Sequence, residues 1–323
     1  MKNIVIIGGG TGTFTLLSGL RKYPSNNTVI VSSADDGGST GILRKELGVM
    51  PPGDIRQCLV GLSYTQKEFQ QLFNFRFPTG SLAGHTVGNI IIAALEKVTG
   101  SIDEAINLSA KMLNVRGTVL PVTLKPTLLL AVLENGKTLV GEHNIDQQNI
   151  KLQISNIKSL KLKPNGPANP KALAAVKSAD AIIFGPGDLF TSTILNLLVK
   201  GVAEAINKSS AKKILITNIM SKFGQTDGFK ASDFVKVLEQ YLKGKIDIAL
   251  VNNKKPAGTI LQKYSKEKAK FIGPDAKNLK SLKVVQENLI SNSTIKKQTG
   301  DKLKRSFLRH DSDKLAKLIW GLV

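Results

Sequence analysis

The opening stretch, residues 2–20, constrains the fold more than any other part of the chain. An apolar run of the kind buried in a parallel sheet, Ile4 to Ile7, breaks into glycines, and a helix with one apolar face follows at once. Glycines let backbone amides and the positive end of a helix dipole approach an anion closely. The stretch therefore predicts a phosphate site with the candidate contacts Gly9, Gly10, Thr11, Gly12 and Thr13.

Known phosphate motifs match this loop only in part. The dinucleotide fingerprint requires Gly-x-Gly-x-x-Gly, and Thr13 stands where its last glycine belongs. The Gly-Lys-Ser/Thr of the Walker motif is missing as well. A tight strand-to-helix turn that binds nothing is the alternative interpretation, because that geometry is common in such folds. The loop thus predicts an anion site without identifying the nucleotide.

The same pattern returns in the second half of the chain. A strand over 181–184 runs into Gly-Pro-Gly-Asp and another helix, and strands over 213–218 and 246–252 flank a helix over 232–242. This alternation predicts an α/β fold, a Rossmann-like, doubly wound and mostly parallel sheet. Glycine-rich strand ends at one edge build a cleft there. The candidate ligand contacts from this half are Gly185, Gly187, Asp188, Thr191, Ser192 and Asn218.

Acidic residues follow the second predicted strand, which ends near Ser32. A carboxylate there often binds a ribose hydroxyl, two adjacent carboxylates can instead hold a magnesium ion on a diphosphate, and a plain polar turn is the third interpretation. We predict ribose or sugar hydroxyls, because no third carboxylate stands beside the pair. The candidate contacts are Asp35, Asp36, Gly37, Ser39 and Thr40, of which Asp35 and Asp36 are also the candidate metal ligands.

Two helix starts between residues 50 and 90 add polar candidates. A cation is disfavoured in the first turn of a helix, so Arg56 indicates an anionic partner, whereas Asp54 is equally well explained as an N-cap. The segment FPTGSLAGHTVGN resembles a further ligand loop before a helix over 87–98, and it contributes His85 and Asn89.

Two residues near the C-terminus complete the candidate site. Arg309 offers a phosphate clamp, and Tyr264 offers a ring face for a base. A surface turn followed by a helix cap is the alternative interpretation of residues 309–311.

The middle of the chain changes to short strands. Over 119–162 an Asn-Gly pair at 135–136 lies between apolar runs, which predicts a hairpin within a β-rich insertion. No linker or internal repeat marks a boundary, so we predict a single domain over 1–323.

Composition excludes several classes of protein. A net charge of +21 is typical of proteins that bind nucleic acid. The lysines are not interleaved with aromatic residues, however, and no nucleic-acid recognition module is present, so we expect a solvated lysine-rich surface and no specific nucleic-acid binding. No run of about 18 apolar residues predicts a membrane span. The single cysteine, Cys58, favours the reducing cytoplasm. Three widely separated histidines give no zinc-site spacing.

Six segments together resemble one family. They are GGGTGTF, ADDGGSTG, PPGDIRQCL, FPTGSLAGHTVGN, NPKALAAVKSADAIIFGPGDLFTSTILNLL and LRHDSDKLA. They resemble the YvcK-like gluconeogenesis factors, which are grouped with the 2-phospho-L-lactate transferases, and the resemblance covers almost the whole chain. It implies a CofD-like fold and a cytoplasmic protein that binds UDP-sugars such as UDP-N-acetylglucosamine. It also implies a part in cell shape and cell-wall synthesis on gluconeogenic carbon sources, through cell-wall synthesis or regulatory proteins.

The transferases of this group move phospholactate from a guanosine diphosphate carrier to a deazaflavin and need magnesium. The resemblance makes Asp35, Asp36 and Asp188 candidates for metal or acceptor contacts, and hence for catalysis. This sequence departs from the transferase pattern, because Lys222 and Gln225 stand where Met-Thr-Gln and Gly-Glu-Thr have glutamine and glutamate. No familiar catalytic set is recognisable.

Two functions therefore remain. The first is a regulator that binds a nucleotide sugar and requires no cofactor, and the second is a magnesium-dependent transferase with a nucleotide-linked donor. NAD contains the same diphosphate and ribose groups as a nucleotide sugar, so it is a further candidate ligand for the cleft. The sequence is compatible with a homodimer.

Overall fold

The computed structural model describes residues 1–151, 157–292 and 306–323. Its centre is a seven-stranded sheet in which every pairing is parallel. The predicted doubly wound α/β architecture is therefore confirmed. From one edge to the other the strands are β10 (Lys283–Glu287), β9 (Ile248–Asn252), β8 (Lys212–Ile216), β7 (Ala181–Phe184), β1 (Lys2–Ile7), β2 (Ser25–Val31) and β3 (Thr118–Pro121).

The chain winds outward from β1 in both directions, through β2 and β3 on one side and from β7 to β10 on the other. The carboxyl ends of β1 and β7 are neighbours, with Ile7 opposite Phe184. Connections leave such a switch point toward opposite faces of the sheet, which opens a crevice between them. Both glycine-rich loops predicted from the sequence begin at this crevice.

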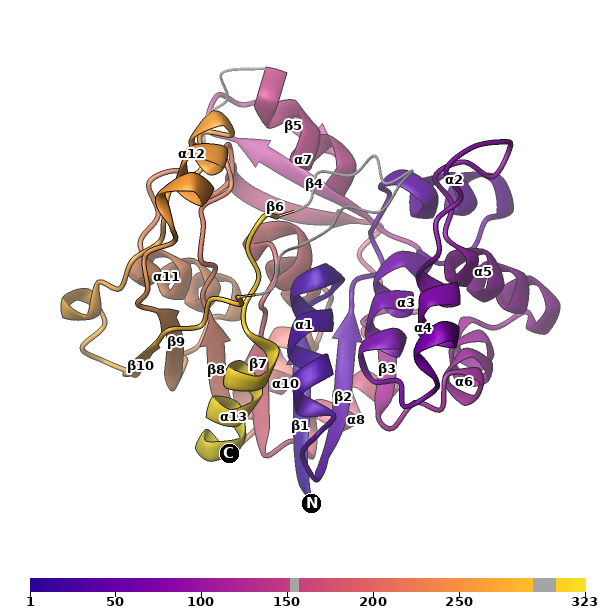
Figure 1. Cartoon of the computed structure of the whole chain (residues 1–323), viewed down its shortest axis with the longest axis horizontal. Helices are drawn as coiled ribbons and strands as arrows, with labels where there is room; N and C mark the ends of the chain where they lie inside the picture. The colour runs from indigo at the N-terminus through magenta and orange to yellow at the C-terminus, as the bar shows by residue number, and fades with distance from the viewer. Residues whose placement is uncertain (152–156, 293–305) are drawn as a thin grey trace.

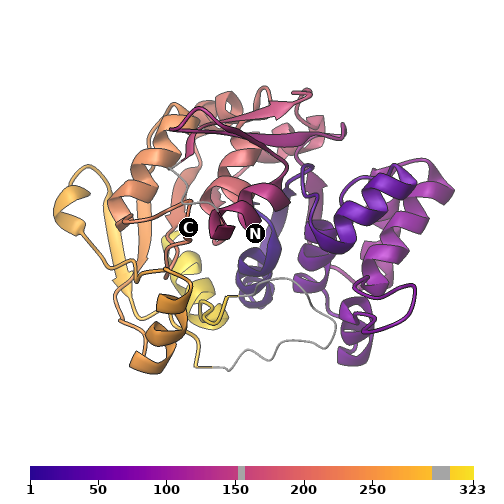
Figure 2. The ribbon, with the colours of Figure 1, turned by 90° about the horizontal axis from the view of Figure 1, so that it is seen from above.

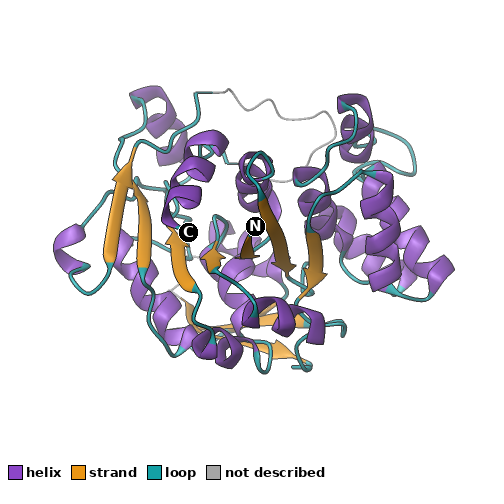
Figure 3. Ribbon diagram, turned by 90° about the horizontal axis from the view of Figure 1, so that it is seen from below, coloured by secondary structure: helices purple, strands orange, loops and turns teal. Residues whose placement is uncertain are grey.

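Helices cover both faces of the sheet (Figure 3). Successive side chains of β1 point to opposite faces, so Ile4 and Ile6 join one apolar core while Val5 and Ile7 join the other. The first core is completed by α1 (Gly10–Leu20), α3 (Pro52–Gly61), α4 (Lys67–Asn74), α5 (Val87–Thr99), α6 (Ile102–Met112) and α13 (Ser312–Leu322). The second is completed by α7 (Glu142–Lys151), α8 (Pro170–Lys177), the π-helical segment η1 (Leu189–Ile194), α9 (Leu195–Leu197), α10 (Val202–Lys208) and α11 (Ala231–Leu242).

The remaining elements lie around this sandwich. They are α2 (Gly38–Leu47), α12 (Gly258–Lys266) and the short 3-10 turn η2 (Ala276–Asn278). Helices α2, α4, α5 and α6 gather beyond the β3 edge of the sheet (Figures 1 and 2). The first and last helices, α1 and α13, pack side by side, and a Cβ on Gly19 would lie only 2.1 Å from the carbonyl oxygen of Ser312. This close contact holds the start of α13, and therefore the segment before it, against α1.

A small antiparallel sheet contains β5 (Thr138–Val140), β4 (Leu128–Leu133) and β6 (Ile157–Lys163) in that order. It lies across the end toward which β1 and β2 point (Figure 1). The predicted hairpin at Asn135 and Gly136 is confirmed, since β4 and β5 pair around it. The insertion range of 119–162 began too early, because β3 pairs with β2 in the large sheet. Residues 152–156 of that range lie outside the described part of the chain.

Candidate functional site

A cleft of about 450 Å³ opens at the carboxyl ends of the central strands. Its wall comes from the loops after β1, β2, β7 and β8, from α3 and α7, and from the segment before α13. Most predicted ligand contacts line it: Gly9, Gly10, Thr11, Gly12, Asp35, Gly37, Ser39, Thr40, Asp54, Arg56, Asn89, Gly187, Asp188, Ser192, Asn218, Tyr264 and Arg309. Chain segments separated by up to three hundred residues therefore meet at one cleft.

The two glycine-rich loops touch each other at the floor of the cleft. Gly10 begins α1 with a φ of +70°, a conformation that favours glycine. A Cβ on Gly12 would lie 2.3 Å from the carbonyl oxygen of Pro186, so the second loop can approach only a glycine at this position. Gly9, the residue before α1, has no side chain to cap the helix, and the Asp54 carboxyl accepts from the amide of Gly10. The amides that follow lie at the cleft wall, where an anion can accept from them.

Two carboxyl groups lie against this cradle. Asp35 accepts a hydrogen bond of 2.9 Å from the amide of Gly37, and burial raises its pKa. Burial, followed by the charge of Asp35, raises the pKa of Asp54 to about 7. Asp54 packs so closely on Gly9 that a Cβ there would lie 1.9 Å from its Oδ2. A protonated Asp54 carries no charge, so below neutral pH the cradle repels an anion less.

A second acidic group is held by a lysine from the loop after β8. The Lys222 ammonium donates to Asp146 Oδ1 over 2.6 Å and to Asp188 Oδ2 over 2.5 Å. The side-chain amide of Gln225 donates to the same Asp146 oxygen over 2.7 Å. Asp146 and the neighbouring Glu142 belong to α7, and burial raises the pKa of both carboxyls. The sequence analysis missed Asp146 and Glu142, because no spacing relates α7 to the distant loops.

A buried polar chain runs along the wall formed by α3 and α5. Arg56 is only 5% exposed, and its Nε donates to Asn89 Oδ1 over 2.8 Å. Asn89 donates in turn to the Ser39 hydroxyl, which lies 3.0 Å from His85 Nδ1. Another nitrogen of Arg56 bonds to the side-chain oxygen of Asn74. These hydrogen bonds join Arg56 to side-chain amides, and its charge partly offsets the burial that raises the pKa of the nearby Asp54, whereas an anionic ligand as its partner stays a prediction.

The segment before α13 closes the cleft beside α12. The Tyr264 hydroxyl lies 2.6 Å from the Ser306 hydroxyl and accepts from the amide of Leu308 over 3.0 Å. Its ring meets that of Phe307 edge-on, with centroids 5.3 Å apart. Tyr264 is 4% exposed, so it also anchors the segment that carries Arg309.

His310 is a wall residue that the sequence analysis did not select. Burial lowers its pKa to about 4, against a smaller raising effect of its hydrogen bond to the backbone of Thr217. The other ring nitrogen, Nε2, is buried and has no hydrogen-bond partner among the residues that the structure describes. A neutral imidazole that donates to a carbonyl through one nitrogen presents an acceptor at the other.

Five predicted contacts lie behind the cleft wall: Thr13, Asp36, His85, Gly185 and Thr191. The Thr13 hydroxyl points to the Pro186 carbonyl at 3.5 Å, and Thr191 is 1% exposed. Asp36 Oδ1 accepts from the amide of His143 over 2.8 Å, so Asp36 secures the insertion. These five residues shape the loops, and their neighbours line the cleft.

Magnesium does not suit the carboxylates that the structure brings together. Asp36 is engaged with α7, and Asp146 and Asp188 already share the Lys222 ammonium. Within the described ranges no group of three or more His, Cys, Asp or Glu side chains is arranged to hold a metal ion. The carboxylates of Asp35 and Asp36, the alternative metal ligands, accept from the amides of two different segments, at Gly37 and at His143.

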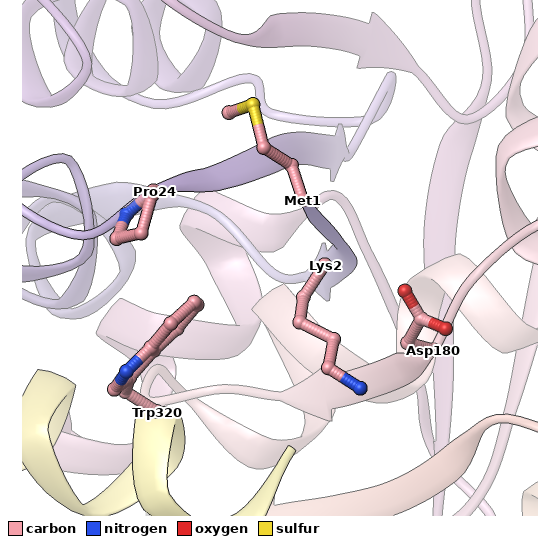
Figure 4. A pocket seen from close by; sticks show the side chains of 5 residues that line it. All are labelled: Met1, Lys2, Pro24, Asp180 and Trp320. Atoms are coloured by element: carbon pink, nitrogen blue, oxygen red, sulfur yellow. The ribbon is translucent and has the colours of Figure 1, made fainter.

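A second hollow lies at the opposite edge of the sheet, around the start of β1 (Figure 4). It is lined by Met1, Lys2, Pro24, Asp180 and Trp320. The Asp180 carboxylate accepts from the amide of Asn3 over 2.7 Å and thereby closes the strand edge. Ligands of open parallel sheets bind at the carboxyl ends of strands, so the cleft at the switch point is the candidate functional site.

Comparison with known proteins gives consistent matches. The family model described as 2-phospho-L-lactate transferase CofD matches residues 4–290. A protein of Thermotoga maritima is 43% identical over 317 residues, covering 98% of each chain. The gluconeogenesis factor of Bacillus subtilis is 38% identical, covering 99% of this chain and 98% of that protein. A crystal structure of a Bacillus halodurans member of the UPF0052 family gives a TM-score of 0.90 at 38% identity, covering 99% and 98% of the two chains.

The fold and the cleft define a doubly wound α/β protein with its candidate site at the switch point of the sheet. The chain belongs to the CofD family and, within it, to the YvcK-like gluconeogenesis factors. The resemblance inferred from the motifs is thus confirmed. No helix in the part of the chain that the structure describes is long and apolar enough to cross a membrane.

Proposed function

We propose that this chain binds a nucleotide sugar of the UDP-N-acetylglucosamine type in the cleft and acts as a regulator of cell shape and cell-wall synthesis under gluconeogenic growth. The observation that carries the proposal is the contact between the two glycine-rich loops, with α1 starting at their junction. Backbone amides at such a junction suit a diphosphate. Asp35 lies after β2, the place from which a carboxylate reaches ribose or sugar hydroxyls.

The roles of the remaining wall residues follow from their chemistry. Arg309 supplies a guanidinium for the phosphates, and Tyr264 supplies part of the surface for the base. His310 presents an acceptor for a donor such as a base N–H or a sugar hydroxyl. A nucleotide sugar carries a diphosphate, hydroxyl groups and a base N–H in one molecule, and these groups match the side chains and backbone amides of the cleft wall.

Isothermal titration calorimetry tests the proposal. The purified chain is titrated with UDP-N-acetylglucosamine, UDP-glucose, GDP and NAD, each in magnesium and in EDTA. We expect the UDP-sugars to bind most tightly. Preference for GDP or NAD, or no binding of any of the four, would contradict the proposed ligand.

The CofD family match favours a second function, a transferase of the 2-phospho-L-lactate type with a nucleotide-linked donor. The ion pair between Lys222 and Asp188 argues against the transferase function, because the charge of this candidate catalytic carboxylate is already neutralised. Incubation with a guanosine diphosphate-linked phospholactate donor and a deazaflavin acceptor, followed by mass spectrometry, separates the two functions. Transferred product would favour the enzyme.

A regulator of this kind acts through a cell-wall synthesis or regulatory protein in the cytoplasm. The buried, unpaired thiol of Cys58 is what a reducing compartment favours. Affinity capture with and without UDP-N-acetylglucosamine, and light scattering for the homodimer, test the partner and the oligomeric state.

A further inference from the structure

The Lys222 ammonium joins three separate parts of the chain. It comes from the loop after β8, while Asp188 precedes η1 after β7 and Asp146 belongs to α7 of the insertion. The two N–O distances are 2.5 Å and 2.6 Å. The Lys222 side chain is 30% exposed, and those of Asp146 and Asp188 are 32% and 37% exposed, so the group lies in the cleft wall rather than on the outer surface.

The surroundings of Lys222 favour its charged form. Burial by itself lowers the pKa of the ammonium, but the charges and hydrogen bonds of Asp146 and Asp188 outweigh it, and the net pKa is raised. The other carboxyls that influence this part of the wall are Asp35, Asp54 and Glu142. A fixed cation among several acidic groups lowers the repulsion that an incoming diphosphate meets.

The loop geometry holds the lysine in place. The Lys222 amide donates to the Thr226 hydroxyl over 2.8 Å, and the Lys222 carbonyl accepts from the amides of Gln225 and Thr226. Gln225 is 1% exposed and adds its own hydrogen bond to Asp146. The backbone and both carboxylate partners thus define one position for the ammonium.

A divalent cation at this place would have to displace the lysine. Magnesium requires oxygen ligands at about 2.0–2.1 Å in octahedral geometry, and Asp146 and Asp188 direct theirs at the ammonium instead. An ammonium that loses its carboxylate partners within a half-buried wall is destabilised, because neither water nor another charge fully replaces them. Lys222 and a bound metal ion therefore exclude each other.

We propose that Lys222 is the resident cation of this cleft, and that the site takes its nucleoside diphosphate ligand without a divalent metal. The second half of this statement rests on the proposed function, whereas the first concerns the protein alone. In the same role Lys222 ties the insertion helix α7 to the loop after β7 and so positions Asp188 at the ligand site.

Manganese binding to the ligand-free protein tests the first half. Electron paramagnetic resonance measures free Mn²⁺ in titrations of the wild type, Lys222→Gln and the control Lys171→Gln, whose lysine forms an exposed ion pair with Asp103. We expect the wild type and the control to bind no Mn²⁺ below about 1 mM, and Lys222→Gln to bind at least about tenfold more tightly, because it leaves two carboxylates unpaired. Tight Mn²⁺ binding by the wild type would overturn the proposal, and so would a folded Lys222→Gln that binds no better.

Circular dichroism establishes that Lys222→Gln is folded, and Lys222→Met serves as the second variant if it is not. Calorimetry with UDP-N-acetylglucosamine tests the second half in the wild type alone. We expect dissociation constants in EDTA and in magnesium to agree within about twofold, whereas a dependence on magnesium of about tenfold or more would overturn it. If no nucleotide binds in either buffer, the proposed function fails, and the Mn²⁺ titration still decides whether Lys222 is the resident cation.

Discussion

Gly12 faces Pro186 so closely that a Cβ on Gly12 would lie 2.3 Å from the Pro186 carbonyl oxygen and 3.2 Å from the amide nitrogen of Gly187. The two loops that form the floor of the cleft are therefore positioned by each other and not by the sheet alone. Any side chain at Gly12 would place its Cβ against the backbone of the loop after β7. No rotamer change relieves this clash, because the position of Cβ is fixed by the backbone.

Gly12→Ala should lower the melting temperature and abolish UDP-sugar binding, because the loop after β7 must move away from α1. Gly187→Leu should leave the fold intact yet block the ligand, since a Cβ there makes its closest contact at 3.3 Å, with the Ser192 side chain. Thermal denaturation and calorimetry measure both effects. Gly258→Ala is the control, because no atom lies within 4 Å of its added Cβ. Binding that survives both cleft substitutions would disprove the shared floor.

The carboxyl of Asp54 predicts a pH dependence. Its pKa is about 7 in the folded chain against 3.8 for the ordinary side chain, so the folded state retains a proton that the unfolded state loses. The contribution of Asp54 to the unfolding free energy should therefore fall as pH rises from about 4 to 7, and affinity for a diphosphate should fall over the upper part of that range. Asp54→Asn should be more stable than the wild type at pH 8, by up to about 4 kcal/mol, and should bind independently of pH between 6 and 8.

Urea unfolding and calorimetry at pH 5, 6, 7 and 8 measure these two dependences. Asp313→Asn is the control, because the Asp313 side chain is 63% exposed in a surface ion pair with Lys22. A difference in unfolding free energy between the wild type and Asp54→Asn that does not change over this range would contradict the prediction for Asp54, because the opposite contribution of His310 is the same in both proteins.

The sequence predicted those parts of the site that follow from local patterns. The apolar run of β1, the glycines after it and the repeat of this pattern at β7 are visible within about ten residues each, and strand-helix alternation predicted a mostly parallel, doubly wound sheet. The pairing of Lys222 with Asp146 joins residues 76 positions apart, and that of Lys222 with Asp188 joins residues 34 apart. Such contacts depend on how the insertion packs against the large sheet, and local sequence periodicity does not reveal this packing.

The same limit explains why Asp36 was selected although it does not line the cleft, and why His310 was not selected although it does. Asp36 stands beside Asp35 in the sequence, but adjacent residues in a turn point in different directions, and Asp36 accepts from the His143 amide instead. His310 has no local signal either, because its environment arises from packing against Thr217 at the end of β8.

His310 should make folding sensitive to acid. Its pKa of about 4 lies below the ordinary 6.5, so between these values the unfolded state binds a proton that the folded state does not. The contribution of His310 to the unfolding free energy should fall as pH drops from about 6.5 to 4, by about 3 kcal/mol in total. In the folded protein, ¹⁵N NMR should show a neutral imidazole at pH 5.5.

His310→Asn retains a side-chain donor for the Thr217 backbone without a titrating ring, and it should lose this part of the pH dependence. His143→Asn, an exposed histidine on α7, is the control. An imidazole signal from residue 310 that is protonated at pH 5.5 would disprove the assignment.

Arg309 and Tyr264 should contribute to binding in different ways. A charge-assisted hydrogen bond to phosphate contributes about 1.5–3 kcal/mol, so Arg309→Ala should weaken UDP-N-acetylglucosamine binding by roughly ten- to a hundredfold. Tyr264→Phe keeps the ring but loses the hydrogen bonds to Ser306 and Leu308, and it should lower the melting temperature of the ligand-free protein. Tyr264→Ala also loses the edge-on contact with Phe307, so its loss of stability should be larger.

Comparison of the two tyrosine variants separates stacking from anchoring. If the ring contributes to the base site, Tyr264→Phe should bind the UDP-sugar within a few-fold of the wild type, while Tyr264→Ala loses a further 1–3 kcal/mol or so, the range for base stacking on aromatic side chains. Calorimetry below the melting temperature of every variant measures this difference. Equal losses in Tyr264→Phe and Tyr264→Ala would show that the residue acts only by holding the segment that carries Arg309.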